Sequence, residues 1–175
     1  MGPVAEFHLK EIAKGFGIPD DFEHLGQLRP DQGEPEVQAE FIRKLNTLQK
    51  SEAAGDPVLD FYVISHGYVG GLDRMTSNTP YSRLFGILQK AIARTGFKRP
   101  LTLNLIVNSC YSGSCERDAT EVFAGTSPRP QVYLYSATSA RTPSTYNREE
   151  GMPHDQPILE FQHLIQRMQQ SGRVS

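Results

Sequence analysis

The sequence predicts an α/β fold, a three-layer sandwich around a mainly parallel central sheet. Three short stretches rich in apolar, β-branched and aromatic residues, 58–64, 103–107 and 131–136, have the composition of strands. Segments of helical periodicity separate them. A strand–helix–strand–helix–strand order folds with right-handed crossovers into a parallel sheet that helices cover. The length of 175 residues suffices for a single domain, residues 1–175, either complete or part of a larger chain.

Apolar residues at helical spacing mark the other elements of the fold. One helix is expected to begin at Glu34-Pro35-Glu36, where proline suits the first turn and the acids suit the positive end of the helix dipole. Another is expected to open at Thr79-Pro80 and to end near Gly96. In chain order, the predicted helices cover residues 4–16, 34–50, 79–96, 115–124 and 157–168.

The remaining segments are rich in glycine, proline and polar residues and are expected to be loops. They include residues 17–36, with a weak strand near 25–28, the polar stretch 72–78, and the stretch 137–152. No convincing strand precedes the helix at residue 34. We therefore expect a first strand to be missing, unless a second chain, a propeptide or a larger parent protein supplies it.

Composition excludes several classes of function. Apolar residues make up 38% of the chain and the net charge is −2, which is typical of neither a disordered chain nor a nucleic-acid or anionic-membrane binder. No apolar run approaches the roughly 20 residues that span a bilayer. The start of the chain has no basic end followed by an apolar stretch, so no signal peptide is predicted. The compartment in which the protein works stays open.

The first two predicted strands both end in residues that can carry chemistry. Strand 58–64 runs into Ser65-His66-Gly67, and strand 103–107 runs into Asn108-Ser109-Cys110. If the two strands are parallel neighbours, the histidine and the cysteine emerge at one edge of the sheet as a base and a nucleophile. A helix start at residues 112–114 would stabilise a thiolate, and the amides of Gly67 and Cys110 would donate to an oxyanion.

Each of these residues also has an interpretation without catalysis. A histidine at a strand end is often an ordinary polar residue, and a cysteine after an apolar run is often a small buried hydrophobe. The two cysteines, Cys110 and Cys115, could also form a disulfide, which would disable the nucleophile. A zinc site would need His66 as a third ligand and an awkward cysteine spacing, so we expect neither metal nor cofactor.

The two motifs together resemble those of the caspase-like cysteine peptidases, a superfamily of caspases, metacaspases, legumains, gingipains and separase. Ile64-Ser65-His66-Gly67 is similar to the caspase histidine motif, and Asn108-Ser109-Cys110-Tyr111-Ser112-Gly113 to the cysteine motif of metacaspases and legumains. The stretches 133–140 and 144–146 resemble the legumain strand and specificity loop after the nucleophile. The resemblance covers roughly residues 35–147.

The resemblance implies a thiol protease that acts on protein or peptide substrates without a cofactor. Cys110 would be the nucleophile, His66 its catalytic partner, and the Gly67 and Cys110 amides the oxyanion hole. The residues that would bind substrate are Asn108, Ser136, Ala137, Thr138 and Arg141. Two features depart from the pattern: legumains have an acidic residue where this chain has Asn108, and the Gln-Ala before the caspase cysteine is absent.

Three hypotheses follow for the function. The first is a cysteine endopeptidase with a His66–Cys110 dyad and a thioester acyl-enzyme. The second is a catalytically silent scaffold or interaction module on the same fold, which the missing first strand favours. The third, a nucleotide-binding protein, lacks the glycine-rich phosphate loop that would follow a first strand.

Overall fold

The computed structural model of the chain describes residues 33–50, 56–74 and 77–141. All of them belong to one compact unit, residues 28–143. The predicted helices at 4–16 and 157–168 and the weak strand near 25–28 lie outside the described residues.

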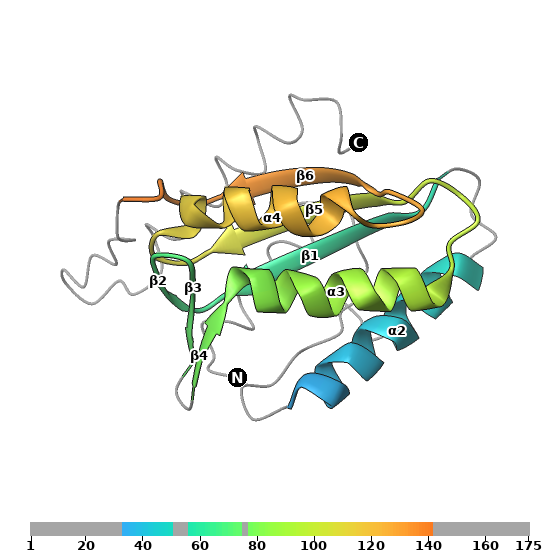
Figure 1. Ribbon diagram of the computed structural model, residues 1–175, viewed down its shortest axis with the longest axis horizontal. Coiled ribbons are helices and arrows are strands. Elements are labelled where there is room, and N and C mark those ends of the chain that lie inside the picture. Colours follow the sequence, from blue (N-terminus) through green and yellow to red (C-terminus); the bar gives the residue numbers. More distant parts are fainter. Residues whose placement is uncertain (1–32, 51–55, 75–76, 142–175) are drawn as a thin grey trace, which may run out of the picture. The chain divides into compact units, whose positions relative to one another are not determined.

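A parallel sheet forms the centre of this unit (Figure 1). It consists of β1 (Val58–Ile64), β5 (Thr102–Asn108) and β6 (Gln131–Ser136), in the order β1-β5-β6. Both neighbouring pairs are parallel, and Ile64 lies opposite Asn108 in the register. The predicted α/β class and the three predicted strands are therefore confirmed. Within the described residues, one edge of this sheet is β1 and the other is β6.

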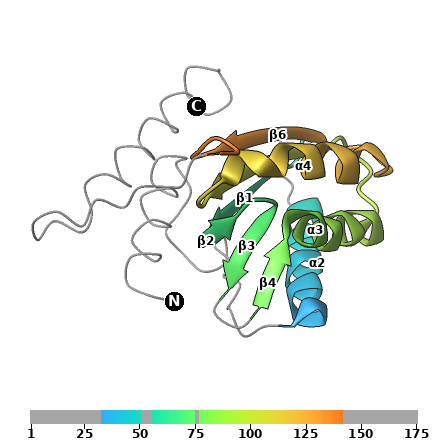
Figure 2. The same cartoon turned by 60° about the vertical axis from the view of Figure 1, so that its left-hand side comes forward.

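Three helices pack against one face of the sheet (Figure 2). They are α2 (Glu34–Lys50), α3 (Tyr81–Thr95) and α4 (Cys115–Ala124), which confirms the three helices predicted in this part of the chain. Every second strand residue faces them, because successive side chains alternate across a sheet. The Phe61 ring of β1, for example, meets Phe41 of α2 edge to face, with the ring centroids 5.2 Å apart.

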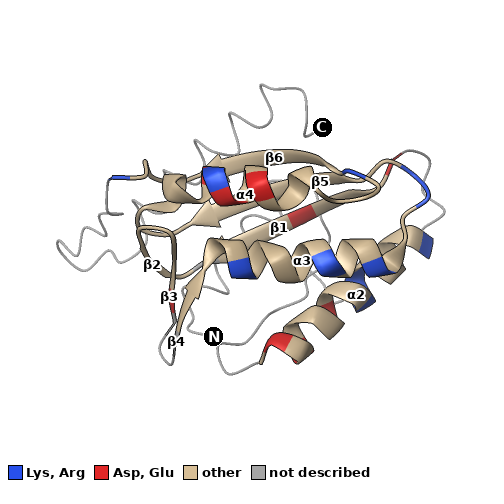
Figure 3. Cartoon of the chain, viewed as in Figure 1, with Lys and Arg blue, Asp and Glu red and all other residues tan. Residues whose placement is uncertain are grey.

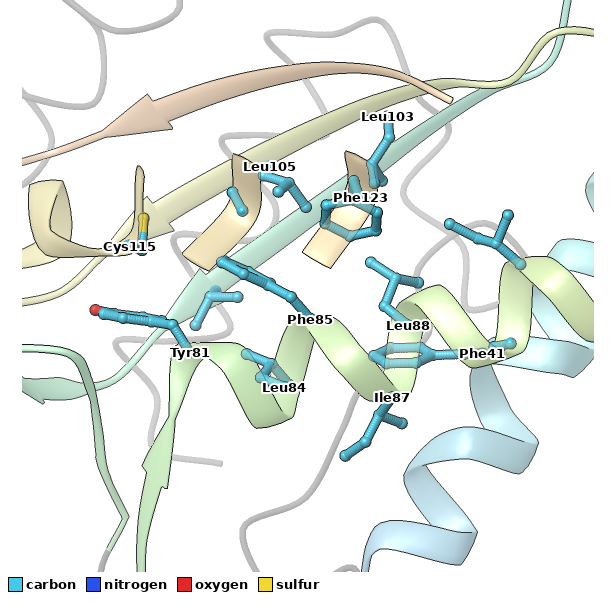
Figure 4. Packing of buried hydrophobic residues seen from close by; sticks show 14 of the residues in the cluster. Phe41, Tyr81, Leu84, Phe85, Ile87, Leu88, Leu103, Leu105, Cys115 and Phe123 are labelled. Carbon is cyan, nitrogen blue, oxygen red and sulfur yellow. The ribbon is translucent and has the colours of Figure 1, made fainter. Parts of the chain in front are cut away.

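The core between helices and sheet is dense and apolar (Figure 4). Phe85 and Leu88 of α3 are fully buried, as are Leu103 and Leu105 of β5. Helix α3 ends at Gly96, whose φ of 64° is left-handed and whose N–H closes the last turn on Ile92 O at 3.3 Å. The core thus holds β1 and β5 in place, and with them the segments that follow each strand.

The opposite face of the sheet carries polar side chains. Asp60, Asn104 and Tyr133 form one row across β1, β5 and β6. The Asn104 amide donates to Asp60 Oδ1 at 2.6 Å, while the Asn104 Oδ1 atom is buried without a partner. Burial raises the pKa of the Asp60 carboxyl above its ordinary value, and the hydrogen bond from Asn104 opposes this shift.

A second, antiparallel sheet follows β1, and the sequence did not predict it. Its strands are β2 (His66–Tyr68), β3 (Gly71–Arg74) and β4 (Ser77–Pro80), in the order β2-β3-β4. The polar loop expected at 72–78 is therefore wrong, whereas the helix expected to open at Thr79-Pro80 begins at Tyr81 with Pro80 as its N-cap. This sheet is short and has no alternating apolar pattern, so its pairing depends on backbone hydrogen bonds and on the turn at Gly70, where φ is 93°.

Charged side chains lie mainly on the helices and their connections (Figure 3). None of the helices in the described part of the chain combines the length and the apolar character that a membrane span requires. The stretches 61–72, 100–115 and 130–140 contain no Asp, Glu, Lys or Arg. These stretches include the carboxyl ends of β1, β5 and β6, so that end of the sheet is almost uncharged.

Candidate active site

The two motifs meet at the carboxyl end of the parallel sheet. Strands β1 and β5 are paired to their last residues, and the Ser65 N–H continues the ladder to Asn108 O at 3.4 Å. His66 and Cys110 follow directly after these positions. The prediction that both residues emerge at one sheet edge is confirmed. His66 is exposed and Cys110 is partly exposed, so both can be reached from solvent.

Gly67 brings the two backbones into contact. A Cβ atom added at this glycine would lie far inside the van der Waals distance of the Cys110 carbonyl oxygen. It would also lie 3.0 Å from the Cβ and Oγ atoms of Ser109. The predicted close backbone approach at Gly67 is therefore confirmed. No side chain other than hydrogen fits there, which explains in physical terms why a glycine follows the histidine.

Residues 109–114, which we call the cysteine loop, form a tight turn in which Ser109 and Ser112 are buried and the other four residues are partly exposed. Tyr111 has a left-handed backbone with φ of 57°, which is costly for a residue with a side chain. A 3₁₀ turn, η1 (Ser112–Ser114), follows it and leads into α4 at Cys115. The sequence predicted a helix start at 112–114, and the structure has this 3₁₀ turn followed by the helix.

The two cysteines differ in environment. Both are free thiols, so the alternative of a Cys110–Cys115 disulfide is not realised. Cys115 is 0% exposed, and burial raises the pKa of its thiol to about 12, which leaves it protonated and unreactive at neutral pH. The described ranges contain no group of three His, Cys, Asp or Glu side chains that could hold a metal ion.

Thr138 binds the cysteine loop from the segment after β6. Its Oγ1 accepts the Ser112 N–H at 3.0 Å and donates to Ser109 O at 3.2 Å. Its N–H donates to Ser112 Oγ at 2.9 Å, and its carbonyl oxygen accepts the Gly113 N–H at 2.9 Å. An added Cβ at Gly113 would lie 2.7 Å from the Ala140 nitrogen, so this second glycine also permits a close backbone approach.

Residues 66–74, which we call the histidine hairpin, comprise β2, the turn at 69–70 and β3. At the turn, the Gly70 N–H donates to Ser114 Oγ at 2.9 Å, and Gly70 O accepts the Tyr81 N–H at 3.0 Å. The register sets Asp73 directly across from His66, and both side chains are exposed. Residues opposite one another in antiparallel strands share a face, so this carboxylate stands on the same face as the imidazole.

The other residues predicted to bind substrate have varied environments. Asn108 is buried, and its amide donates to the Tyr62 hydroxyl at 3.1 Å. Ser136 is the last residue of β6, and the Ala137 N–H continues the ladder to Val107 O at 3.0 Å. Arg141 is exposed at the end of the described residues. Of the predicted set, Thr138 is thus the one bound directly to the cysteine loop.

Several hydroxyl residues that organise the site were not singled out from the sequence. Tyr81, the first residue of α3, is fully buried, and its hydroxyl hydrogen-bonds with Ser109 Oγ at 2.7 Å. Burial also raises the pKa of Tyr81 to about 12, so it keeps its proton. The sequence offers one indication of these hydroxyl contacts, because the cysteine motif contains serines at positions 109, 112 and 114.

Comparisons with known proteins assign neither a family nor a function to this chain. No protein-family model matches the chain, and a search of curated proteins gives no significant match. The chemistry of the site therefore has to be argued from its residues. A thiol and an imidazole at one sheet edge, beside backbone amides, are the groups that nucleophilic acyl transfer requires.

Proposed function

We propose that this chain is a cysteine endopeptidase with a caspase-like three-layer fold, in which Cys110 is the nucleophile and His66 its partner. The observation that carries the proposal is the backbone contact between Gly67 and Cys110, which joins the two motifs at the end of β1 and β5. A contact this close requires a glycine next to the histidine. A fold that used His66 and Cys110 only as surface residues would have no need for it.

In the proposed reaction, His66 takes the proton of the Cys110 thiol and the thiolate attacks the carbonyl carbon of a peptide bond. The amides of Gly67 and Cys110 stabilise the negative charge on the carbonyl oxygen. Protonated His66 then gives its proton to the leaving amine, and a thioester remains on Cys110. Water then attacks the thioester and gives a proton to His66; the carbon–sulfur bond breaks, the carboxylic acid leaves, and His66 returns the proton to the Cys110 sulfur.

The uncharged end of the sheet bears on the choice of substrate. Asp, Glu, Lys and Arg are absent from 61–72, 100–115 and 130–140, so the strand ends and the cysteine loop offer no formal charge to a substrate side chain. Asp73, which lies across from His66 in the hairpin, is a formal charge beside the proposed dyad, and Arg141 is another on the segment after β6. We propose that these two groups, and not the strand ends, supply any preference for a charged substrate residue.

The first test compares three variants in a peptide-library cleavage assay. We expect Cys110→Ala to abolish turnover, and His66→Ala to reduce it by at least about a hundredfold. Cys115→Ala is the matched control, because it removes a thiol from the same segment that is buried and unreactive. Full activity of Cys110→Ala, with folding verified by circular dichroism, would rule out the proposal.

A second test needs no substrate. Alkylation by iodoacetamide at pH 7 should label Cys110 rapidly in the wild type and more slowly in His66→Ala, while Cys115 stays unlabelled in both. Slow labelling of Cys110 in both proteins, together with no cleavage, would favour a scaffold without catalysis. In that case the chain should bind its partners equally well with and without the Cys110 thiol.

A further inference from the structure

We infer that Ser114 is a positioning residue that aligns the histidine hairpin with the cysteine loop, and this inference rests on the proposed His66–Cys110 dyad. Its hydroxyl has two partners. It accepts the N–H of Gly70, at the tip of the hairpin, at 2.9 Å, and it donates to Tyr111 O, inside the cysteine loop, at 2.7 Å. One oxygen atom therefore links the element that carries His66 to the turn that carries Cys110.

The ordinary role of a serine at this position is a different one. Ser114 is the residue before the first turn of α4, where a serine hydroxyl usually accepts an N–H of that turn. Here the Ser114 side chain makes no such cap bond. Its hydroxyl is directed to the hairpin instead, so the contact with Gly70 cannot be a by-product of helix capping.

Loss of this hydroxyl should affect the hairpin more than the cysteine loop. The backbone N–H of Ser114 also donates to Tyr111 O, at 2.9 Å, so the turn stays closed without the side chain. The Gly70 N–H has no second acceptor among the hydrogen bonds described for it, and it would be left without a partner. The hairpin would then keep its bond to Tyr81, its pairing with β4 and the buried Leu72, but its tip would lose its bond to the cysteine loop.

The cysteine loop offers a matched control in Ser112. Its hydroxyl belongs to the same loop but bonds only with Thr138, from the segment after β6. Ser112→Ala therefore removes a hydroxyl from the loop without touching the hairpin. Any general effect of loosening the loop should be visible in this variant.

The experiment is a double-mutant cycle on the alkylation rate of Cys110 at pH 7, measured in the full chain. We expect Ser114→Ala to slow alkylation about tenfold in the wild type, as the loss of one aligned hydrogen bond implies, and by less than about twofold in a His66→Ala background. Ser112→Ala should have the same effect in both backgrounds. Ser114→Thr, which keeps the hydroxyl, should restore most of the rate.

Equal effects of Ser114→Ala in both backgrounds would overturn the role of Ser114, because the residue would then act on the loop and not through His66. Equal alkylation of wild type and His66→Ala would overturn the dyad and this inference with it. Amide exchange at Gly70 provides an independent check, since its protection should fall in Ser114→Ala and persist in Ser112→Ala. Unchanged protection at Gly70 would also overturn the inference.

Discussion

The cysteine loop and the histidine hairpin carry the two halves of the proposed dyad, yet they are held in different ways. Two residues of the loop are buried, with Ser109 and Ser112 only 1% and 0% exposed, and hydroxyls from Tyr81 and Thr138 bind the loop from two sides. The tip of the hairpin is open to solvent, with Val69 64% exposed, while Leu72 of β3 is buried in the core. The cysteine loop is thus fixed by buried hydroxyl contacts while Cys110 itself stays partly exposed, whereas close contacts at Gly67 and Gly70 join the hairpin to the loop.

The largest effect is expected from Gly67→Ala, which breaks the contact between the two regions. The added methyl group would collide with the Cys110 carbonyl and with Ser109, so the hairpin must move away from the loop. Overpacking of this kind costs about 1–3 kcal/mol of stability, and a displacement of about 1 Å at a catalytic pair can cost a hundredfold in rate. Urea unfolding and peptide cleavage measure the two effects.

Gly86→Ala is the control for this variant. It makes the same chemical change within α3, where nothing lies within 4 Å of the added atom. Alanine is favoured over glycine inside a helix by about 1 kcal/mol, so this variant should be more stable than the wild type and fully active. If Gly67→Ala also kept full activity, the backbone contact would not be what aligns the motifs.

The next largest effect is expected from Thr138→Val, which loosens the cysteine loop alone. Valine has nearly the same shape, but it leaves the buried Ser112 N–H and Ser109 carbonyl without the partner they have in Thr138. An unsatisfied buried polar group costs about 1–3 kcal/mol, and the turn with the left-handed Tyr111 would lose two of the hydrogen bonds that tie it to Thr138. We expect a lower unfolding midpoint in urea and slower alkylation of Cys110.

Thr138→Ser keeps the hydroxyl and should stay close to the wild type in both measurements. The contrast between valine and serine separates the hydrogen bonds from the packing of the Thr138 methyl group. Equal losses in the two variants would mean that the methyl group, and not the hydroxyl, holds the loop.

The same difference between the regions explains what could be predicted from the sequence. Strands β1 and β6 and helix α4 were predicted to the residue, because burial imposes an apolar pattern on each of them. The meeting of His66 and Cys110 at one edge followed from two parallel strands. These features could be predicted because the residue pattern within each segment was enough, and no side-chain contact between distant segments had to be known.

The hairpin and the hydroxyl contacts could not be predicted in the same way. Strands β3 and β4 carry Gly71, Asp73 and Asn78, which resemble loop residues, and their pairing follows from a turn whose register cannot be read from composition. Thr138 was selected as a substrate-binding residue by resemblance, and its hydroxyl is bonded to the cysteine loop. A hydroxyl can bond with many neighbours, so its partner depends on the finished fold.

A smaller effect is expected from Asp60→Asn, which tests a partly buried polar group of the sheet away from both regions. Burial raises the pKa of Asp60 in the folded protein above its value in the unfolded chain, so the folded state binds the proton more tightly. The contribution of Asp60 to stability is therefore complete below the unfolded pKa and is lost as pH rises toward the folded pKa. An amide does not titrate, and it can donate to the unpartnered Asn104 Oδ1.

We therefore expect Asp60→Asn to gain about 1 kcal/mol over the wild type at pH 7, with a smaller difference at pH 4. Urea unfolding at both pH values measures this gain. Peptide cleavage should not change, because Asp60 pairs with Asn104 and not with the residues at the strand ends. If the variant were less stable than the wild type at pH 7, the Asp60 carboxylate would be stabilised by more than the hydrogen bond from Asn104.

The smallest effect is expected from Arg117→Ala, which asks whether the sensitivity of the cysteine loop extends to residues close to it in sequence. Arg117 follows the loop by three positions, and its guanidinium pairs with Glu121 at 2.7 Å on the outer face of α4. Both side chains are exposed, and exposed pairs of this kind contribute little. We expect unfolding in urea and Cys110 alkylation to match the wild type. Because Thr138 reaches the loop from a distant segment and Arg117 does not touch it, a clear loss in Arg117→Ala would mean that α4 itself, and not the buried hydroxyl contacts, holds the nucleophile in place.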